Sequence, residues 1–152
     1  MKPVIVMASD HAGFHMKEFV KQQLEDAGYT VEDYGTHSEE SVDTAPYAFR
    51  VGEEVAAHPG EKKGILICGT GLGMSIAANK VKGVRAPLVH DLFSAKMTVE
   101  HNHANVLCMG ARVIAPNMAW EITKVWLAAK PLCGGKYERR VQQITDYDNK
   151  RG

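Results

Sequence analysis

The chain has 152 residues, a length that fits one domain with a single sizeable core. Its 18 basic and 18 acidic residues cancel, so the charge gives no reason to expect nucleic acid or an acidic membrane as a partner. The amino terminus lacks a signal-peptide pattern, no apolar run approaches the roughly 18 residues of a membrane span, and the 3 cysteines include no Cys-x-x-Cys pair. We therefore expect a cytoplasmic protein with one domain over residues 1–152 and a small molecule as its partner.

The first half of the chain predicts strands that alternate with helices. A continuous apolar run lies near the amino terminus, and apolar residues then recur at helical spacing until Gly28, a residue typical of helix ends. Pro46 stands where the first turn of a helix accepts proline, and Pro59 marks the end of that helix. The predicted elements are a strand over 4–8, a helix over 14–27, a strand over 29–34 and a helix over 45–57.

The second half continues the pattern. Asp91 is a typical residue for the start of a helix, and Pro131 breaks the helix before it. Strands that alternate with helices favour right-handed crossovers, so we expect an α/β fold with a five-stranded parallel sheet, helices on both faces and a C-terminal helix. The predicted elements are a strand over 65–68, a helix around 76–78, a strand over 84–90, a helix over 91–100, a strand over 105–110, a helix over 117–129 and a helix over 136–148.

The strongest chemical signal is Cys68 and the loop that follows it. Glycines at positions 69, 71 and 73 come directly after a buried strand and directly before a helix. The backbone N–H groups of such a loop and the positive end of the helix dipole attract anions, and they favour a thiolate over a thiol. Cys68 is therefore a candidate base or nucleophile. A purely structural turn is the alternative, since the spacing fits neither a Walker A loop nor a dinucleotide fingerprint.

Polar residues also follow the other predicted strands. Asp10 and His11 come directly after the first strand, and His90 and Asp91 lie at the end of the strand over 84–90. Ligands of parallel sheets bind outside the carboxyl ends of the strands, so we expect Asp10, His11 and the Cys68 loop to share one crevice. A helix-capping aspartate beside an exposed histidine is the structural alternative for the first pair.

His101 and His103 form a His-x-His pair between the helix over 91–100 and the last strand. Two alternate histidines without a third ligand nearby are weak evidence for a metal, and an acid/base role for one of them is more economical. The last helix carries Lys136 and Arg140 four residues apart, hence on one face, where they can hold a dianion. A solvated basic surface is the alternative. Cys108 is expected in the core.

The chain resembles the type B ribose-5-phosphate isomerases, a family grouped with bacterial allose- and galactose-6-phosphate isomerases. The resemblance covers essentially the whole chain, and four motifs occur in the family's order. They are Ser9-Asp10-His11-Ala12-Gly13, the central stretch 67–80, His101-Asn102 with 105–107 and 110–113, and Gly134-Gly135 before the basic helix.

This resemblance implies a three-layer Rossmann-like (flavodoxin-like) fold and an isomerisation of a phosphorylated sugar through an enediolate, without metal or cofactor. Cys68 is implied as the base that moves a proton between C1 and C2, with the developing oxyanion on the backbone N–H groups of 69–73 and with Thr70 orienting the step. His101, assisted by Asp10, is implied to open the sugar ring. The implied substrate-binding residues are His11, Gly69, Gly71, Leu72, Gly73, Ser75, Asn102, Arg112, Lys136 and Arg140.

The resemblance also implies a homodimer in which each site is shared, with the segment 101–112 contributed by the partner subunit. The sequence leaves open whether dimers pair into tetramers.

Two residues depart from the family pattern. Thr44 stands in the loop where the family commonly has a tyrosine, and Lys136 stands where many members have an arginine that grips phosphate in a bidentate way. Both departures leave the substrate open between ribose 5-phosphate, galactose or allose 6-phosphate and erythrulose 4-phosphate. A non-catalytic phosphate-binding module and a redox sensor based on Cys68 are the alternatives from other classes.

Overall fold

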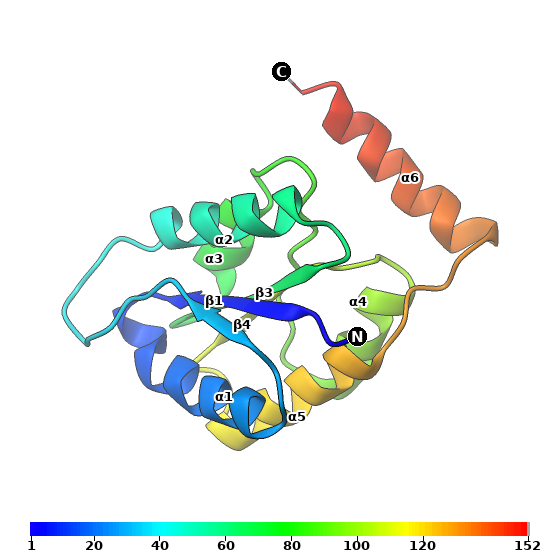
Figure 1. Cartoon of the computed structure of the whole chain (residues 1–152). Helices are drawn as coiled ribbons and strands as arrows, with labels where there is room; N and C mark the ends of the chain where they lie inside the picture. The colour runs from blue at the N-terminus through cyan, green and yellow to red at the C-terminus, as the bar shows by residue number, and fades with distance from the viewer. Residues whose placement is uncertain (152) are drawn as a thin grey trace.

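A parallel sheet forms the centre of the molecule (Figure 1). It has four strands. The structure is a computed structural model, and it describes residues 1–151. The strand order is β2-β1-β3-β4, so β1 and β3 are the two central strands. All neighbouring strands are parallel; the strands are β1 (Val4–Ser9), β2 (Val31–Asp33), β3 (Lys62–Cys68) and β4 (Val106–Gly110).

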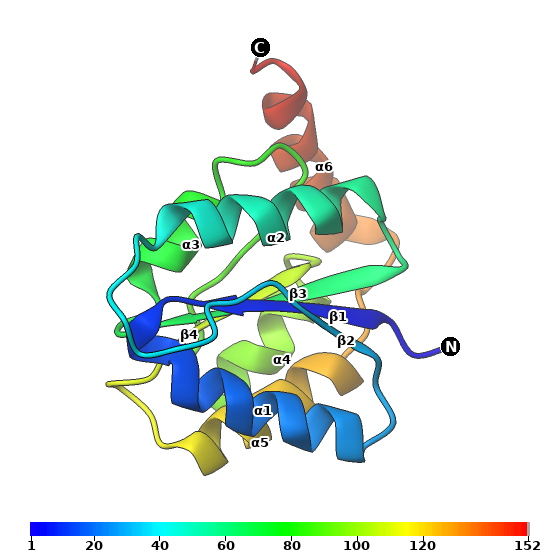
Figure 2. The same ribbon diagram turned by 60° about the vertical axis from the view of Figure 1, so that its left-hand side comes forward.

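Helices cover both faces of this sheet, which confirms the predicted three-layer α/β arrangement. In Figure 2, α2 and α3 lie on one face, and α1, α4 and α5 lie on the other. The helices are the short 3-10 helix η1 (His11–Gly13), α1 (Phe14–Asp26), α2 (Ala45–Ala57), α3 (Leu72–Ala78), α4 (Leu92–Glu100), α5 (Pro116–Ala128) and α6 (Gly135–Asn149).

The central strands are apolar at successive positions because both of their faces are buried. In β1, Ile5 and Met7 pack into the cluster under α1, α4 and α5, whereas Val6 and Ala8 pack into the cluster under α2 and α3. The strand β3 divides its side chains between the two clusters in the same way, and Cys68 belongs to the cluster under α3. The alternation therefore directs the Cys68 side chain towards the layer that contains the glycine loop and α3.

The predicted fifth strand over 84–90 is wrong. Only Leu88 forms a bridge with Cys108 of β4, and the segment is otherwise irregular. Pro87 lies in the middle of the segment and has no N–H to give to a ladder. The N–H groups of Arg85 and Ala86 are instead bound by the side-chain oxygens of Asn105 and Asn79, at 2.8 and 2.9 Å. The segment thus runs beside β4 without becoming a strand of the sheet.

The C-terminal helix α6 projects away from the sheet and its covering helices (Figures 1 and 2). Val141 is its one buried residue, while Ile144 and Tyr147 are exposed. A side-chain oxygen of Asp148 accepts a hydrogen bond from the Gly83 N–H at 2.6 Å, which ties the far end of the helix to the turn after α3. Within residues 1–151, none of the helices is long and apolar enough to cross a bilayer.

The topology fixes where a ligand crevice lies. From β1 the chain passes to β2 on one side, and from β2 it crosses to β3 on the other side of β1. This reversal creates a switch point between β1 and β3, and the carboxyl ends of the two strands frame a crevice there. Ser9 and Ile67 are paired across the strands at this end, directly before Asp10 and Cys68.

Candidate active site

Cys68 ends β3 with its side chain at the base of the glycine loop. The residue is 5% exposed, and its Sγ accepts a hydrogen bond from the Gly71 N–H at 3.2 Å. Gly71 has a φ of +78°, and a Cβ there would lie 2.4 Å from Leu88 and 2.9 Å from the Met109 backbone. Only glycine fits both the backbone angle and the space. The predicted arrangement of strand, tight loop and helix is confirmed, and the loop directs at least one N–H to the sulfur.

The residues after β4 close the other side of this loop. The Arg112 N–H donates to the Gly69 carbonyl at 2.9 Å. The Arg112 guanidinium lies over Gly69, where a Cβ would stand 3.1 Å from Nη1. A Cβ on Gly110 would lie 2.5 Å from the Thr70 backbone, so close packing holds the loop against β4. Arg112 therefore lies beside the Cys68 loop of its own chain, and the implied assignment of Arg112 to the partner's half of the site does not fit this geometry.

Asp10 reaches the same crevice from the end of β1 and is 6% exposed. Its Oδ1 accepts hydrogen bonds from the N–H groups of Ala12 and Gly13 at 3.0 and 3.2 Å, so it caps η1. Its Oδ2 accepts a hydrogen bond from the Thr44 hydroxyl at 2.9 Å. The carboxylate is thus fully oriented by groups from η1 and from the start of α2.

Thr44 and His11 complete this wall of the crevice. The Thr44 methyl group would lie 3.5 Å from a Cβ on Gly73, so Thr44 also adjoins the far end of the glycine loop. His11 accepts a hydrogen bond from the Val42 N–H at its Nδ1, at 3.2 Å, which leaves the proton of a neutral imidazole on Nε2. The predicted convergence of Asp10, His11 and the Cys68 loop is therefore present in a single chain.

His90, at the end of the segment over 84–90, also lies beside the crevice, although no sequence motif assigns it to the site. Its Nε2 accepts a hydrogen bond from the Gly110 N–H at 2.8 Å. Gly110 is also the residue of β4 that pairs with Cys68 of β3. Burial lowers the pKa of His90, and the nearby Asp91 opposes that shift less strongly. A neutral imidazole is the form that this contact requires, because a protonated ring has no acceptor nitrogen.

A second group of predicted residues lies at the opposite end of the sheet. Cys68 pairs with Gly110, the last residue of β4, whereas His101 and Asn102 precede the first residue of that strand. The Gly64 N–H, four residues before Cys68, donates to the Asn105 carbonyl. At about 3.3 Å per residue along a strand, this separation exceeds any hydrogen-bond distance. One chain by itself does not bring His101 to Cys68.

At that second end, His101 stacks on Tyr137 of α6. The ring centroids are 4.0 Å apart and the planes differ by 1°. The charged ends of Lys136 and Arg140 lie 5.2 and 5.9 Å from the centre of the same Tyr137 ring. The structure therefore brings together His101, Lys136 and Arg140 around a tyrosine that the sequence motifs did not identify.

Asn102 and Ser75 line a groove of about 530 Å³ between α3, the segment over 84–87 and α6. The Ser75 hydroxyl donates to the Ala86 carbonyl at 2.7 Å, so it holds the irregular segment in place. Leu72, another predicted substrate-binding residue, is exposed at the start of α3. The hydroxyl of Ser75, a predicted substrate-binding residue, thus donates its proton to the backbone of its own chain, and the residue lies on the side of α3 that faces the groove.

His103, the second histidine of the His-x-His pair, has a backbone carbonyl as its partner. Nε2 of His103 lies 3.0 Å from the Leu132 carbonyl, and no group of three or more His, Cys, Asp or Glu suited to a metal occurs within residues 1–151. Cys108 is buried in β4, as predicted, and burial raises the pKa of its thiol. Cys133 is exposed, and none of the three cysteines is in a disulfide.

Comparison with known proteins identifies the family of this chain. The model of the family described as Ribose/Galactose Isomerase matches residues 5–144. The chain is 42% identical over 148 residues to ribose-5-phosphate isomerase B of Escherichia coli, a match that covers 97% of each protein. It is 42% identical over 125 residues to D-erythrulose-4-phosphate isomerase 2 of Mycolicibacterium smegmatis, which covers 81% of this chain and 82% of that protein.

A solved structure is similar over nearly the full length. The chain superposes on ribose-5-phosphate isomerase B from Mycoplasma genitalium with bound ribulose 5-phosphate, with a TM-score of 0.94, 36% identity and 99% of each chain covered. The region that the family model matches contains β1 from its second residue, the Cys68 loop and most of α6. On the family model and on these relatives, the chain belongs to the Ribose/Galactose Isomerase family.

Proposed function

We propose that this protein is an aldose–ketose isomerase that interconverts ribose 5-phosphate and ribulose 5-phosphate through an enediolate. One observation carries the proposal: Cys68 lies in a crevice that also holds the Asp10 carboxylate, the glycine loop and Arg112. The crevice therefore combines a proton carrier with donors for a developing negative charge, which is what enediolate chemistry needs. The family and the ribulose 5-phosphate bound to the Mycoplasma genitalium relative support this sugar class.

In the proposed reaction, the Cys68 thiolate takes the proton from C2 of the open-chain aldose. The electron pair of that C–H bond forms the C1–C2 double bond, and negative charge develops on the oxygen at C1. Backbone N–H groups of residues 69–73 stabilise this oxygen, and Thr70, which is exposed above the loop, orients the sugar. The proton of the C2 hydroxyl passes to the C1 oxygen, and Cys68 returns its own proton to C1 as the C2 oxygen becomes the carbonyl, so no redox partner is consumed.

Ring opening and phosphate binding need residues from the opposite end of the sheet, where His101, Lys136 and Arg140 surround Tyr137. In the proposed homodimer, His101 and Asn102 of one chain approach the Cys68 crevice of the other. His101 protonates the ring oxygen and takes the anomeric proton, and Asp10 assists it. The phosphate binds among the charged side chains of Arg112, Lys136 and Arg140 and the Nε2–H of His11, because a dianion is best held by several donors from different elements.

The position of α6 supports this pairing. The helix projects from the body (Figure 1). It carries Lys136 and Arg140 at its start, and its Ile144 and Tyr147 are exposed. Exposed apolar side chains on a projecting helix favour contact with another chain. In a twofold dimer, the α6 side of each chain meets the Cys68 crevice of the other chain, so the dimer has two equivalent sites. The cytoplasmic location remains a prediction from the sequence.

A related sugar phosphate is the second candidate, and Thr44 favours it. Threonine is smaller than the tyrosine common in the family, and its hydroxyl is directed to Asp10. With threonine in place of tyrosine, this wall of the pocket leaves more space for the sugar and presents a different polar group to it. Erythrulose 4-phosphate, the substrate in the name of the Mycolicibacterium smegmatis relative, and the 6-phosphates of galactose and allose are the alternatives to compare.

The test is turnover of the purified protein on four- to six-carbon sugar phosphates, with and without a strong chelator. We expect the highest kcat/KM on ribose 5-phosphate and no loss under chelation. Cys68→Ala should lower kcat by about 10² to 10⁴, the usual contribution of a positioned base, whereas Cys133→Ala at an exposed site should be neutral. Absence of aldose–ketose interconversion, or full activity of Cys68→Ala, would refute the proposal.

A further inference from the structure

A small basic pocket lies at the amino end of β3 and β4, the end of the sheet opposite Cys68. Its volume is about 260 Å³. Its walls come from the turn between α2 and β3, the start of β3 and the residues that precede β4. No aspartate or glutamate lines it; its polar and charged lining residues are Lys62, Lys63, Arg85, His103 and Asn105.

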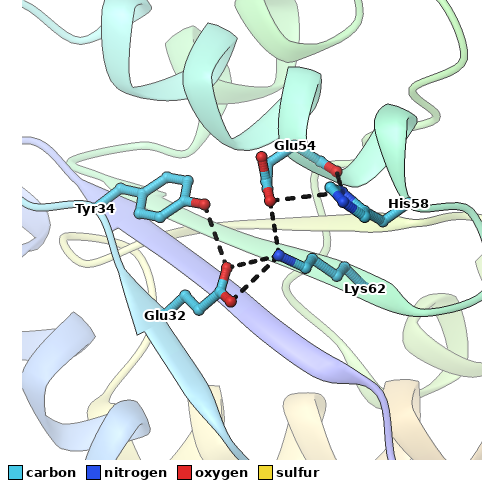
Figure 3. A network of polar contacts seen from close by, with 5 residues as sticks. All are labelled: Glu32, Tyr34, Glu54, His58 and Lys62. Carbon is cyan, nitrogen blue, oxygen red and sulfur yellow. Dashed lines mark hydrogen bonds and ion pairs between the residues drawn. The ribbon is translucent and has the colours of Figure 1, made fainter.

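Lys62 is already neutralised on the α2 side of the sheet. Figure 3 shows its ammonium group between the carboxylates of Glu32 and Glu54, at 3.0 and 2.7 Å. The Tyr34 hydroxyl donates to Glu32 at 3.2 Å, and His58 adjoins Glu54. The hydrogen bonds to Glu54 and Glu32 raise the pKa of Lys62. The carboxylates of Glu32 and Glu54 are therefore paired with Lys62.

Lys63 has no such partner. It is half-buried, its ammonium lies 5.2 Å from the centre of the Trp126 ring on the other face of the sheet, and no carboxylate within residues 1–151 is at ion-pair distance from it. Burial and, to a smaller extent, the charge of Lys130 lower the pKa of Lys63. A half-buried cation without a counter-ion costs free energy, which an added anion would recover.

Arg85 adds a second cation to the same pocket. Its Nε donates to the His103 carbonyl at 2.9 Å, which fixes the guanidinium plane. The two terminal amino groups have no hydrogen-bond partner within residues 1–151. Burial lowers the pKa of Arg85, and Asp148, the carboxylate that opposes this shift, is held by Gly83 and Arg151. A fixed guanidinium with open donors matches the geometry of an oxyanion.

We propose that this pocket binds an oxyanion of the size of phosphate between Lys63 and Arg85. The pocket is smaller than the roughly 300 to 1,000 Å³ of sites for larger ligands, so it suits inorganic phosphate or sulfate better than a whole sugar phosphate. The bound anion supplies the missing counter-charge and stabilises the fold at the end of the sheet that the catalytic crevice does not use.

The test counts phosphate ions per chain by equilibrium dialysis at low ionic strength, with the full-length protein. Lys63→Met keeps the apolar stem and removes the charge. Lys124→Met is the matched control, since Lys124 also lies over a tryptophan, Trp120 at 5.7 Å, but is paired with Glu121. We expect Lys63→Met to bind one phosphate fewer than wild type, or to bind it about tenfold or more weakly, and Lys124→Met to match wild type.

Thermal unfolding gives an independent readout. Phosphate should raise the melting temperature of wild type more than that of Lys63→Met, while without phosphate Lys63→Met should be at least as stable as wild type. Any phosphate that binds in the Cys68 crevice does so in both proteins. The difference between their rises in melting temperature therefore reports binding in the basic pocket alone, and it does so whether or not the proposed function holds. Equal phosphate counts and affinities, or an equal rise in melting temperature, in wild type and Lys63→Met would overturn the proposal.

Discussion

The hydroxyl of Thr44 donates a hydrogen bond to Oδ2 of Asp10 at 2.9 Å, although Thr44 is the residue that precedes the first turn of α2. A threonine at that position normally caps its own helix, and this one makes no capping bond. Its hydroxyl is used instead to orient a carboxylate whose other oxygen is held by two backbone N–H groups. The start of α2 is thereby coupled to the proposed catalytic crevice.

Removing this hydroxyl should misorient Asp10. For Thr44→Val, which keeps the shape of the side chain, we expect kcat to fall by about tenfold or more with a smaller change in KM, because small misplacements of catalytic groups are costly. Thr44→Ser retains the donor and should stay within about threefold of wild type. Steady-state kinetics on ribose 5-phosphate checks both. A Thr44→Val protein with wild-type kcat would show that Asp10 needs no such support.

Mixing two inactive variants tests the shared site. Cys68→Ala removes the base from one half of the proposed site, and His101→Ala removes the ring-opening group from the other. If each site takes Cys68 from one chain and His101 from its partner, a mixed dimer contains one intact site. An equal mixture that is unfolded and refolded together should recover about a quarter of wild-type activity.

The matched control for this mixing is Cys68→Ala with Thr70→Ala, two residues of the same loop. These changes leave no intact site in any mixed dimer whose sites are shared in the proposed way, so activity should not rise above that of the separate variants. Recovery with the control pair, or no recovery with Cys68→Ala and His101→Ala, would contradict the proposed pairing.

Local patterns were sufficient to predict the core of the crevice. The apolar run before Cys68, the alternating glycines and the polar residues after β1 each depend on neighbouring residues in the sequence, and the structure brings them together as parallel-sheet topology requires. The strand over 84–90 was wrong for a local reason as well, since Pro87 weakens the pairing that its apolar neighbours favour.

Contacts between distant segments could not be read from the sequence. Thr44 lies 34 residues from Asp10 along the chain, and His90 lies 20 residues from Gly110. Neither pair leaves a periodic or motif signal. The stacking of His101 on Tyr137 joins the end of α4 to α6, a contact that the sequence pattern of neither helix determines. Such pairs become visible only when the fold is known.

Acidification should weaken the support that His90 gives to Gly110. The pKa of His90 is lowered in the folded protein, so the unfolded chain binds the proton first. The contribution of this contact is therefore complete above the unfolded pKa of about 6.5 and is lost as the pH falls towards the folded value. His90→Gln keeps an acceptor that does not titrate, and it should reduce the loss of stability between about pH 7.5 and pH 5.

Urea unfolding at the two pH values measures this difference. His15→Gln is the control, because His15 is exposed on α1 and pairs with Glu39 away from the crevice. His15→Gln should lose as much unfolding free energy on acidification through His90 as wild type does. If His90→Gln loses as much stability on acidification as wild type, the contact with Gly110 does not control this pH dependence.

Lys17 and Asp33 form an ion pair that fastens α1 to the end of β2. The Lys17 side chain is 0% exposed, and its ammonium lies 2.6 Å from Oδ2 of Asp33 and 2.9 Å from Glu18. Burial by itself raises the pKa of Asp33, but hydrogen bonds from Lys17 and from the Gly35 N–H outweigh it, so the pKa lies below its usual value. The carboxylate is thus charged throughout the neutral range, as the buried ammonium requires.

Asp33→Asn should therefore cost about 3 kcal/mol of unfolding free energy at neutral pH, because it leaves the buried Lys17 charge with Glu18 alone. The double variant Lys17→Met/Asp33→Asn removes both charges and should recover part of that loss. Because the folded pKa of Asp33 is depressed, its contribution is present above an unfolded pKa of about 3.9 and disappears as the pH falls through the folded value, so the gap between wild type and Asp33→Asn should narrow in acid. Urea unfolding at matched protein concentration measures all three proteins. A double variant less stable than Asp33→Asn would mean that the Lys17 ammonium is stabilised by groups other than Asp33.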